Sequence, residues 1–191
     1  MDILLTHGYF IADDPREQKI MRPYPPLGLL CVGAYLRERN LDVSNFDSTF
    51  SSYEALQAHL LEHRPRFMGI YVNLMTRANV VRLMSFIREH PDLKDMRILL
   101  GGPEVRNHKE NFLRAGADVL VLGEGEATMY DAITTLGNAF SPFLDQVPGI
   151  AYIKARDEVV ENETRTHNRN LAELPVTGTD LKYQQPYQDA R

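Results

Sequence analysis

The feature that most constrains the fold of this chain is a regular alternation of short apolar runs with segments of helical periodicity. The apolar runs, which are typical of strands, are at 3–6, 41–47, 67–72, 97–100 and 119–122. The helical segments are at 27–39, 53–64, 80–87, 109–115 and 129–136. This alternation favours a parallel sheet, because each parallel connection needs a crossover long enough to hold a helix. Since such crossovers are nearly always right-handed, the sequence predicts a doubly wound, Rossmann-like α/β domain with a five-stranded parallel sheet and helices on both faces.

The pattern changes after the last helical segment. Beyond Pro148 and Gly149, the runs GIAYI and VVEN flank the polar segment KARDE, which predicts a β-hairpin. From about Glu163 onwards the chain is polar, as expected of a linker or tail with little core of its own. We therefore expect an α/β domain at 1–147, a hairpin extension at 148–162 and a linker or tail at 163–191.

Composition and charge exclude several classes of function. The formal net charge is −5 and the basic residues are scattered, whereas nucleic-acid binders usually carry a basic patch, so we expect no nucleic-acid partner. No apolar run reaches the roughly 18 residues that cross a bilayer, and no signal peptide is visible. We therefore expect a cytoplasmic protein without a membrane partner. The single cysteine, Cys31, can form neither an internal disulfide nor a cysteine-ligated iron–sulfur cluster.

Small, backbone-exposing residues gather where the predicted strands end. In an open α/β sheet the ligand crevice lies beyond the carboxyl ends of the strands, and glycine there lets the main chain approach a ligand. A ligand at this edge is favoured over the simpler interpretation that strand-to-helix turns need glycine. The residues that follow the third, fourth and fifth strands are Asn73, Leu74, Met75 and Thr76; Gly101, Gly102, Pro103 and Glu104; and Gly123, Glu124, Gly125 and Glu126.

A proline-rich approach to the first helical segment belongs to the same edge. Residues 8–26 are predicted to form a long loop, which in a compact domain is usually functional or mobile. This loop ends in the motif YPPLGL at 24–29, where prolines stiffen the chain and Gly28 leaves room for a bulky, flat guest. The alternative interpretation is a helix started by proline and packed close to the sheet.

No catalytic or metal site can be assigned from the residues. Glu124 and Glu126 are better explained as favourable charges at a helix N-terminus than as an acid–base pair. His59 and His63 are four residues apart on a helix, but no third ligand accompanies them, so a solvated helix face is the preferred interpretation. His7 ends the first strand and faces the expected crevice, yet a histidine with its hydrogen bonds satisfied inside a loop is preferred there too. Cys31 is expected to be a small buried apolar residue.

In series, these segments resemble one family, the N-terminal cobalamin-binding domain of radical S-adenosylmethionine enzymes. The resemblance covers about residues 24–175, and YPPLGL, LLGGP and GEGE are its most specific motifs. The matching segments, in chain order, are YPPLGLLCVGAYLRERNLDVSNFDS, PRFMGIYVNLMT, RILLGGPEVRNH, ADVLVLGEGEAT, VPGIAYI and LAELP.

The resemblance implies a flavodoxin-like strand order, 2-1-3-4-5, with cobalamin across the carboxyl ends of the strands and its nucleotide tail beside the sheet. Tyr24, Pro25, Pro26, Leu27 and Gly28 would then line the corrin side. Asn73, Leu74, Met75 and Thr76 would contact the ring or the tail. Gly101, Gly102, Pro103 and Glu104 would lie along the tail, and Gly123, Glu124, Gly125 and Glu126 near the ring edge or the nucleotide loop.

Two motifs of related proteins are missing from this chain. The DxHxxG motif, which supplies a histidine ligand to cobalt in other cobalamin domains, is absent, so no lower cobalt ligand is assigned. The CxxxCxxC motif is absent too, so S-adenosylmethionine and a 4Fe–4S cluster would belong to a radical S-adenosylmethionine domain provided in cis or in trans. In relatives that motif follows soon after a segment like LAELP, so the chain resembles an isolated N-terminal domain, a truncated form of a longer protein, or a free-standing relative.

Three functions follow as hypotheses. The first is a module that presents methylcobalamin for methyl transfer to carbon, although relatives also perform ring rearrangements. The second is an interaction or scaffold domain that has lost its cofactor, with Met75 or Glu104 filling the crevice. The third is a small flavodoxin-like enzyme that binds a nucleotide or anion, which is disfavoured because the GxGxxG and GxxxxGK[ST] motifs are absent.

Overall fold

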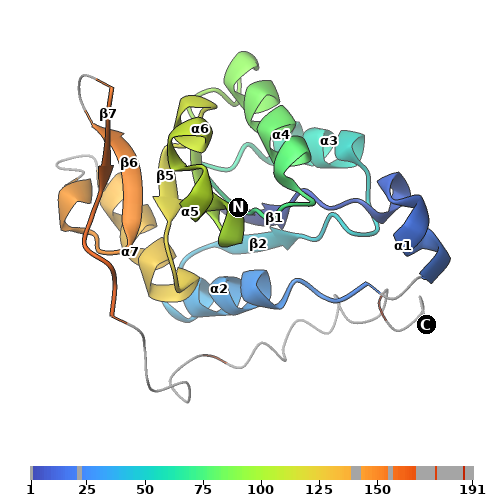
Figure 1. Cartoon of the computed structure of the whole chain (residues 1–191), viewed down its shortest axis with the longest axis horizontal. Helices are drawn as coiled ribbons and strands as arrows, with labels where there is room; N and C mark the ends of the chain where they lie inside the picture. The colour runs from blue at the N-terminus through green and yellow to red at the C-terminus, as the bar shows by residue number, and fades with distance from the viewer. Residues whose placement is uncertain are drawn as a thin grey trace.

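One mixed sheet forms the centre of the domain in the computed structural model, which describes residues 2–20, 23–138, 143–154 and 157–166 together with Pro175 and Tyr187. Within these residues, seven strands lie in the order β2-β1-β3-β4-β5-β6-β7. Figure 1 shows β5, β6 and β7 side by side at one side of the molecule. Strands β1 to β5 pair in parallel, whereas β6 and β7 are antiparallel to their neighbours. The strands are β1 (Ile3–His7), β2 (Val43–Phe46), β3 (Phe67–Tyr71), β4 (Arg97–Gly101), β5 (Val119–Val121), β6 (Ile150–Lys154) and β7 (Glu158–Glu161).

The predicted five-stranded, all-parallel sheet is therefore wrong in strand count and in strand direction. The hairpin expected at 148–162 is present, but its strands continue the same sheet, with Val119 of β5 paired to Tyr152 of β6. Without β6, the three-residue strand β5 would be an open edge with unpaired backbone groups. Along the parallel part, the order β2-β1-β3-β4-β5 is the one that the family resemblance implies.

Helices cover both faces of the sheet, as the alternation predicts. On one face, α2 (Leu27–Glu38) and α7 (Gly125–Gly137) contribute Leu29, Leu36 and Met129 to a buried cluster. The opposite face is covered by α3, α4 and α6, with Leu56, Leu83 and Phe112 among the buried side chains. The bounds on this face are α3 (Tyr53–His63), α4 (Arg77–Glu89), α5 (Pro103–Asn107) and α6 (Lys109–Arg114).

The long loop predicted at 8–26 contains helices instead. A 3₁₀ helix, η1 (Ile11–Asp13), is followed by α1 (Pro15–Ile20). The Asp14 carboxylate accepts hydrogen bonds from the backbone N–H groups of Arg16 and Glu17, both at 3.1 Å. An aspartate before a proline is a strong helix start, because the side chain caps free N–H groups and proline needs no donor at the first position. Another 3₁₀ helix, η2 (Leu144–Gln146), precedes the hairpin.

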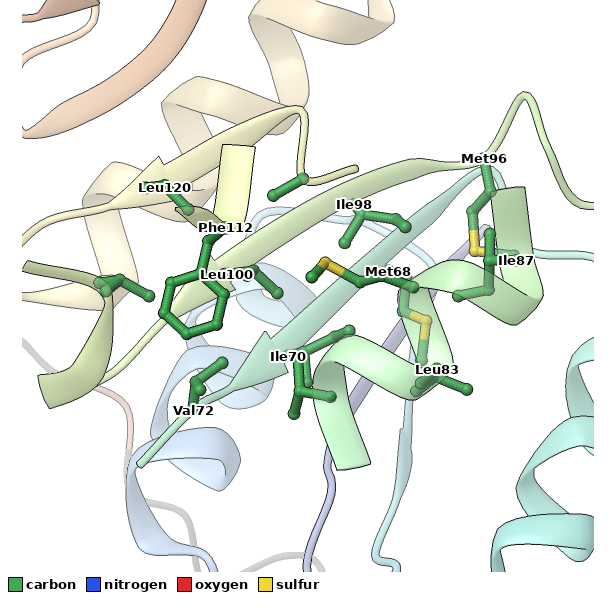
Figure 2. Packing of buried hydrophobic residues seen from close by; sticks show 14 of the residues in the cluster. Met68, Ile70, Val72, Leu83, Ile87, Met96, Ile98, Leu100, Phe112 and Leu120 are labelled. Atoms are coloured by element: carbon green, nitrogen blue, oxygen red, sulfur yellow. The ribbon is translucent and has the colours of Figure 1, made fainter. Parts of the chain in front are cut away.

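Alternation along β3 decides which face each of its side chains enters. Met68 and Ile70 point into the cluster shared with α4 and α6, which Figure 2 shows from close by. Phe67 belongs to the cluster on the α2 and α7 face. Gly69 is therefore on that second face as well, where it contributes no side chain.

The predicted tail at 163–191 lies mostly outside the described residues. In the part of the chain that the structure describes, no helix is long and apolar enough to cross a bilayer.

Truncating a central side chain of the Figure 2 cluster tests the packing. Leu100 is completely buried on β4, so Leu100→Ala should lower the free energy of unfolding by about 2–5 kcal/mol. The control is Val81→Ala on α4, where the residue is 36% exposed and outside the buried clusters, so a smaller loss is expected. Urea unfolding followed by circular dichroism measures both, and an equal, small effect of the two substitutions would contradict the packing described.

Candidate functional site

A cavity of about 290 Å³ opens on the face of the sheet that α2 and α7 cover, at the carboxyl ends of the parallel strands. Its walls are mainly apolar side chains and bare peptide. The lining residues are Leu5, Gly28, Leu29, Val32, Gly69, Ile70, Tyr71, Gly101, Gly102, Val121, Gly123, Glu124, Gly125, Glu126 and Met129.

Gly69 lies at the floor of this cavity, where it makes room for two neighbouring side chains. A Cβ atom at this position would lie 2.6 Å from Cδ2 of Leu5 and 3.1 Å from Cε of Met129. Both atoms belong to residues that line the cavity, one on β1 and the other on α7. The cavity therefore extends below the strand ends, between the sheet and the helices.

Glycines form the rim. Gly102 has φ 106° and ψ 176°, a region that is essentially restricted to glycine, and a Cβ there would lie 2.4 Å from the backbone oxygen of Val72. Gly123 also has a positive φ, of 101°. At Gly28, by contrast, an added Cβ would meet nothing within 4 Å. Peptide backbone is thus exposed on the β4 and β5 side of the mouth, and open space faces Gly28 on the α2 side.

Carboxylates occupy the end of the cavity where α7 begins. Glu124 is the N-cap residue of α7, and Glu126 is in its first turn. Burial, and to a lesser extent the charge of Glu126, raise the pKa of the half-buried Cys31 thiol, so this cysteine remains a neutral side chain. Negative charge at this helix end disfavours a phosphate there, in agreement with the missing nucleotide motifs.

The structure brings together some of the residues predicted from sequence and leaves others apart. Those that line the cavity are Gly28, Gly101, Gly102, Gly123, Glu124, Gly125 and Glu126. Those that do not line it are Tyr24, Pro25, Pro26, Leu27, Asn73, Leu74, Met75, Thr76, Pro103 and Glu104. For all of these residues, contact with a cofactor stays a prediction.

The predicted residues outside the cavity differ in exposure. Tyr24, Leu27, Leu74 and Met75 are large apolar side chains with 62–82% of their surface exposed, and they precede or begin α2 or follow β3. Thr76 is buried in the turn after β3. The backbone N–H of Asn73 donates to the Thr76 hydroxyl, and the backbone N–H of Thr76 donates to Oδ1 of Asn73, both at 3.0 Å. Asn73 and Thr76 therefore shape the turn in which Leu74 and Met75 are exposed.

In the cofactor-free hypothesis, Met75 or Glu104 fills the crevice. Neither residue lines the cavity. Met75 is 67% exposed. The Glu104 carboxylate lies 3.3 Å from Nη1 of Arg77 and 3.7 Å from Nε2 of His108. This ion pair joins α4 to α5 and keeps the Glu104 side chain out of the cavity lining.

Sequence reasoning missed the apolar walls of the cavity. Most of these wall residues belong to the buried clusters, so their sequence pattern does not separate them from the rest of the core. Gly69 is different. A glycine inside a continuous apolar strand often marks a close approach of another group. The missed residues are Leu5, Leu29, Val32, Gly69, Ile70, Tyr71, Val121 and Met129.

His7 is satisfied inside the fold, as predicted. Its Nε2 is 2.9 Å from the Asp47 carboxylate, and its Nδ1 is 3.3 Å from the N–H of Tyr9 and 3.1 Å from the Ser48 hydroxyl. The side chains of Ser48, His7 and Asp47 thus adjoin, although sequence spacing did not suggest it. Ser48 has no exposed surface and lies 2.6 Å from the His7 carbonyl, to which it can donate, so it is not placed as a nucleophile.

His59 and His63 pack against each other on α3, with 4.2 Å between ring centroids. Burial and the neighbouring His63 lower the pKa of His59, which favours its neutral form. Among the described residues, no group of three or more histidine, cysteine, aspartate or glutamate side chains is placed to hold a metal ion.

The fold and the cavity define a class: a doubly wound α/β domain with an apolar ligand site at the carboxyl edge of its sheet. The family described as the B12 binding domain matches residues 18–133, which is more than half of the chain. The chain therefore belongs to the B12 binding domain family.

Known proteins agree with this assignment. The anaerobic magnesium-protoporphyrin IX monomethyl ester cyclase of Synechocystis sp. is 34% identical over 152 residues, which cover 76% of this chain and 28% of that protein. The cobalamin-dependent S-adenosylmethionine radical enzyme OxsB with aqua-cobalamin bound has a TM-score of 0.81 at 22% identity, over 99% of this chain and 25% of that chain. The apo form of OxsB gives a TM-score of 0.72 at 25% identity, over 95% of this chain and 24% of that chain. The chain thus spans about a quarter of the length of these proteins, and at these identities the OxsB structures support the fold.

The rim glycine of β4 provides a test of the site's geometry. Gly102→Ala should destabilise the domain by about 1–3 kcal/mol, because alanine is strained at this φ and ψ and its Cβ meets backbone. Gly137→Ala, at the end of α7, is the control, since its Cβ would be 3.8 Å from Phe67 in ordinary contact. Thermal unfolding measures both, and a Gly102→Ala variant as stable as Gly137→Ala would contradict the rim conformation.

Proposed function

We propose that this chain is the cobalamin-binding domain of a cobalamin-dependent radical S-adenosylmethionine enzyme. The observation that carries the proposal is the glycine-rimmed apolar cavity at the carboxyl edge of a B12 binding domain. Its residues fit a large, mostly apolar ligand with amide fringes, because flat peptide surfaces allow close approach and offer hydrogen-bonding groups.

The size of the cavity indicates which part of the cofactor enters it. At about 290 Å³ it is at the lower end of ligand pockets, which are roughly 300–1,000 Å³. It can hold one aromatic ring system and is too small for a whole corrin. The nucleotide base at the end of the cobalamin tail would enter between the sheet and the helices, beside Leu5, Gly69 and Met129.

The corrin would then lie across the rim. Four segments would contact it there: the loop 24–28, the turn 73–76, the β4 end at 101–104 and the β5 end at 123–126. Exposed apolar side chains at Tyr24, Leu27, Leu74 and Met75 supply surface that a corrin can cover. When bound as methylcobalamin, the cofactor supplies a transferable methyl group.

The remaining chemistry would belong to another domain. The chain has one cysteine, so a three-cysteine cluster motif with its 4Fe–4S cluster and S-adenosylmethionine would be provided by a radical S-adenosylmethionine domain, in cis or in trans. Residues 163–191 would be the linker towards that domain, after an α/β domain at 1–147 and the hairpin at 148–162. Methyl transfer to carbon is the proposed reaction of the assembled enzyme. Ring formation is the second candidate, because the Synechocystis relative is a cyclase.

A comparison of two corrinoids tests the role of the cavity. Hydroxocobalamin should bind the chain at least about tenfold more tightly than dicyanocobinamide, which lacks the nucleotide tail, because the apolar base is buried only in the first case. Isothermal titration calorimetry measures both affinities. Equal affinities would exclude the tail from the cavity, and no binding of either compound would favour the cofactor-free scaffold function.

A side chain added at Gly28 should block the site without disturbing the fold. Nothing lies within 4 Å of a Cβ at this position, so the ring in Gly28→Phe can occupy the mouth of the cavity. We expect at least about tenfold weaker hydroxocobalamin binding with an unchanged melting temperature. Gly137→Ala, remote from the cavity lining, should bind like the unsubstituted chain. Undiminished binding by a folded Gly28→Phe variant would contradict the proposed position of the cofactor.

A further inference from the structure

A tyrosine near the C-terminus is buried at the β1 and β2 end of the same sheet edge. Tyr187 is 5% exposed, although the sequence predicts a polar tail around it. Its hydroxyl donates to Oδ2 of Asp47 at 2.6 Å and lies 3.0 Å from Oγ1 of Thr49. Its ring packs edge-on against Phe50, with 4.9 Å between centroids. These contacts join residues about 140 positions apart in the chain.

The residues that receive Tyr187 are held in place by the rest of the domain. Oδ1 of Asp47 is 2.9 Å from Nε2 of His7 and accepts the N–H of Thr49 at 3.0 Å. The backbone carbonyl of Thr49 accepts the N–H of Ile11 at 3.0 Å. Asp47 therefore directs one carboxylate oxygen to the domain and the other to Tyr187.

The protonation states suit a strong hydrogen bond. Burial raises the pKa of Asp47, but hydrogen bonds from His7, Tyr187 and Thr49 outweigh it and lower that pKa overall. Burial and the contact with Asp47 raise the pKa of the Tyr187 hydroxyl. At neutral pH an ionised carboxylate thus faces a protonated phenol, and 2.6 Å is a typical length for such a charge-assisted bond.

We propose that Asp47, Thr49 and Phe50 form a docking slot for Tyr187, the Tyr187 slot, which anchors the chain at this residue to the carboxyl edge of the sheet. The slot is built by the fold and does not need a cofactor. One consequence does rest on the proposed function: the slot fixes the side from which a following radical S-adenosylmethionine domain approaches the edge that carries the cavity.

Limited trypsin digestion of the 191-residue chain, without cobalamin, tests the slot. Lys182 is the internal trypsin site nearest to Tyr187 in the sequence. Tyr187→Phe should raise the rate of cleavage at Lys182 about tenfold, because it removes a hydrogen bond to a charged group while it keeps the ring. Tyr187→Ala should raise the rate further. The matched control, Tyr183→Phe, removes a hydroxyl from the same part of the sequence and should leave the rate within about twofold.

A second set of variants identifies the partner. Asp47→Asn should accelerate cleavage as Tyr187→Phe does. The double variant should be cleaved no faster than either single variant, because both substitutions act on the same hydrogen bond. If circular dichroism shows that Asp47→Asn is unfolded, the Phe50→Ala variant replaces it, because Phe50 is 39% exposed. Equal cleavage of the unsubstituted chain and Tyr187→Phe, or effects that multiply in the double variant, would overturn the proposal. Since the digests contain no cobalamin, a failure of cofactor binding leaves this result unaffected.

Discussion

The packing of helix α7 over the sheet, at the floor of the cavity, depends on a side chain that is absent from the centre of the sheet. β3 is packed on both faces, and alternation places Gly69 opposite α2 and α7, between Leu5 and Met129. A larger residue there would collide with Leu5 and Met129, so these two side chains can pack over the strand only because it carries a hydrogen at this point. The cavity lies beside them. The glycines at the ends of β4 and β5 continue this space to the surface. Core side chains and bare peptide are what remain to line it, which explains its apolar character.

The carboxyl edge of the sheet is divided into two environments. One is the mainly apolar cavity, which is lined by Leu5 of β1 and by residues of β3 to β5. The other is a network of polar groups around Asp47 at the ends of β1 and β2. Both ring nitrogens of His7 have partners in that network. His7, which sequence position places at the expected crevice, therefore holds the ends of β1 and β2 together. A buried carboxylate needs such donors, and Tyr187 supplies one of them from the far end of the chain.

Periodicity predicted the parallel strands and the principal helices, because short apolar runs and amphipathic repeats report burial directly. It did not predict that the hairpin joins the sheet, since pairing of β5 with β6 depends on an edge that only the assembled sheet reveals. The short helices α1 and α5 were missed at Asp14–Pro15 and Gly102–Pro103, where the start signals are a cap or a proline and no apolar repeat follows. The rim of the site was predicted through its glycines. Its walls were not, because Val121 or Met129 has the same sequence pattern whether it faces a cavity or the core.

The proposed function requires the base of the cobalamin tail to occupy the cavity between the sheet and the helices α2 and α7. A crystal structure of the chain with hydroxocobalamin tests this most directly. We expect electron density for the base between the sheet and the helices α2 and α7, in contact with Leu5, Gly69 and Met129, and a corrin across the strand ends. Density for the cofactor elsewhere on the domain, with no density for the base in the cavity between the sheet and the helices α2 and α7, would contradict it.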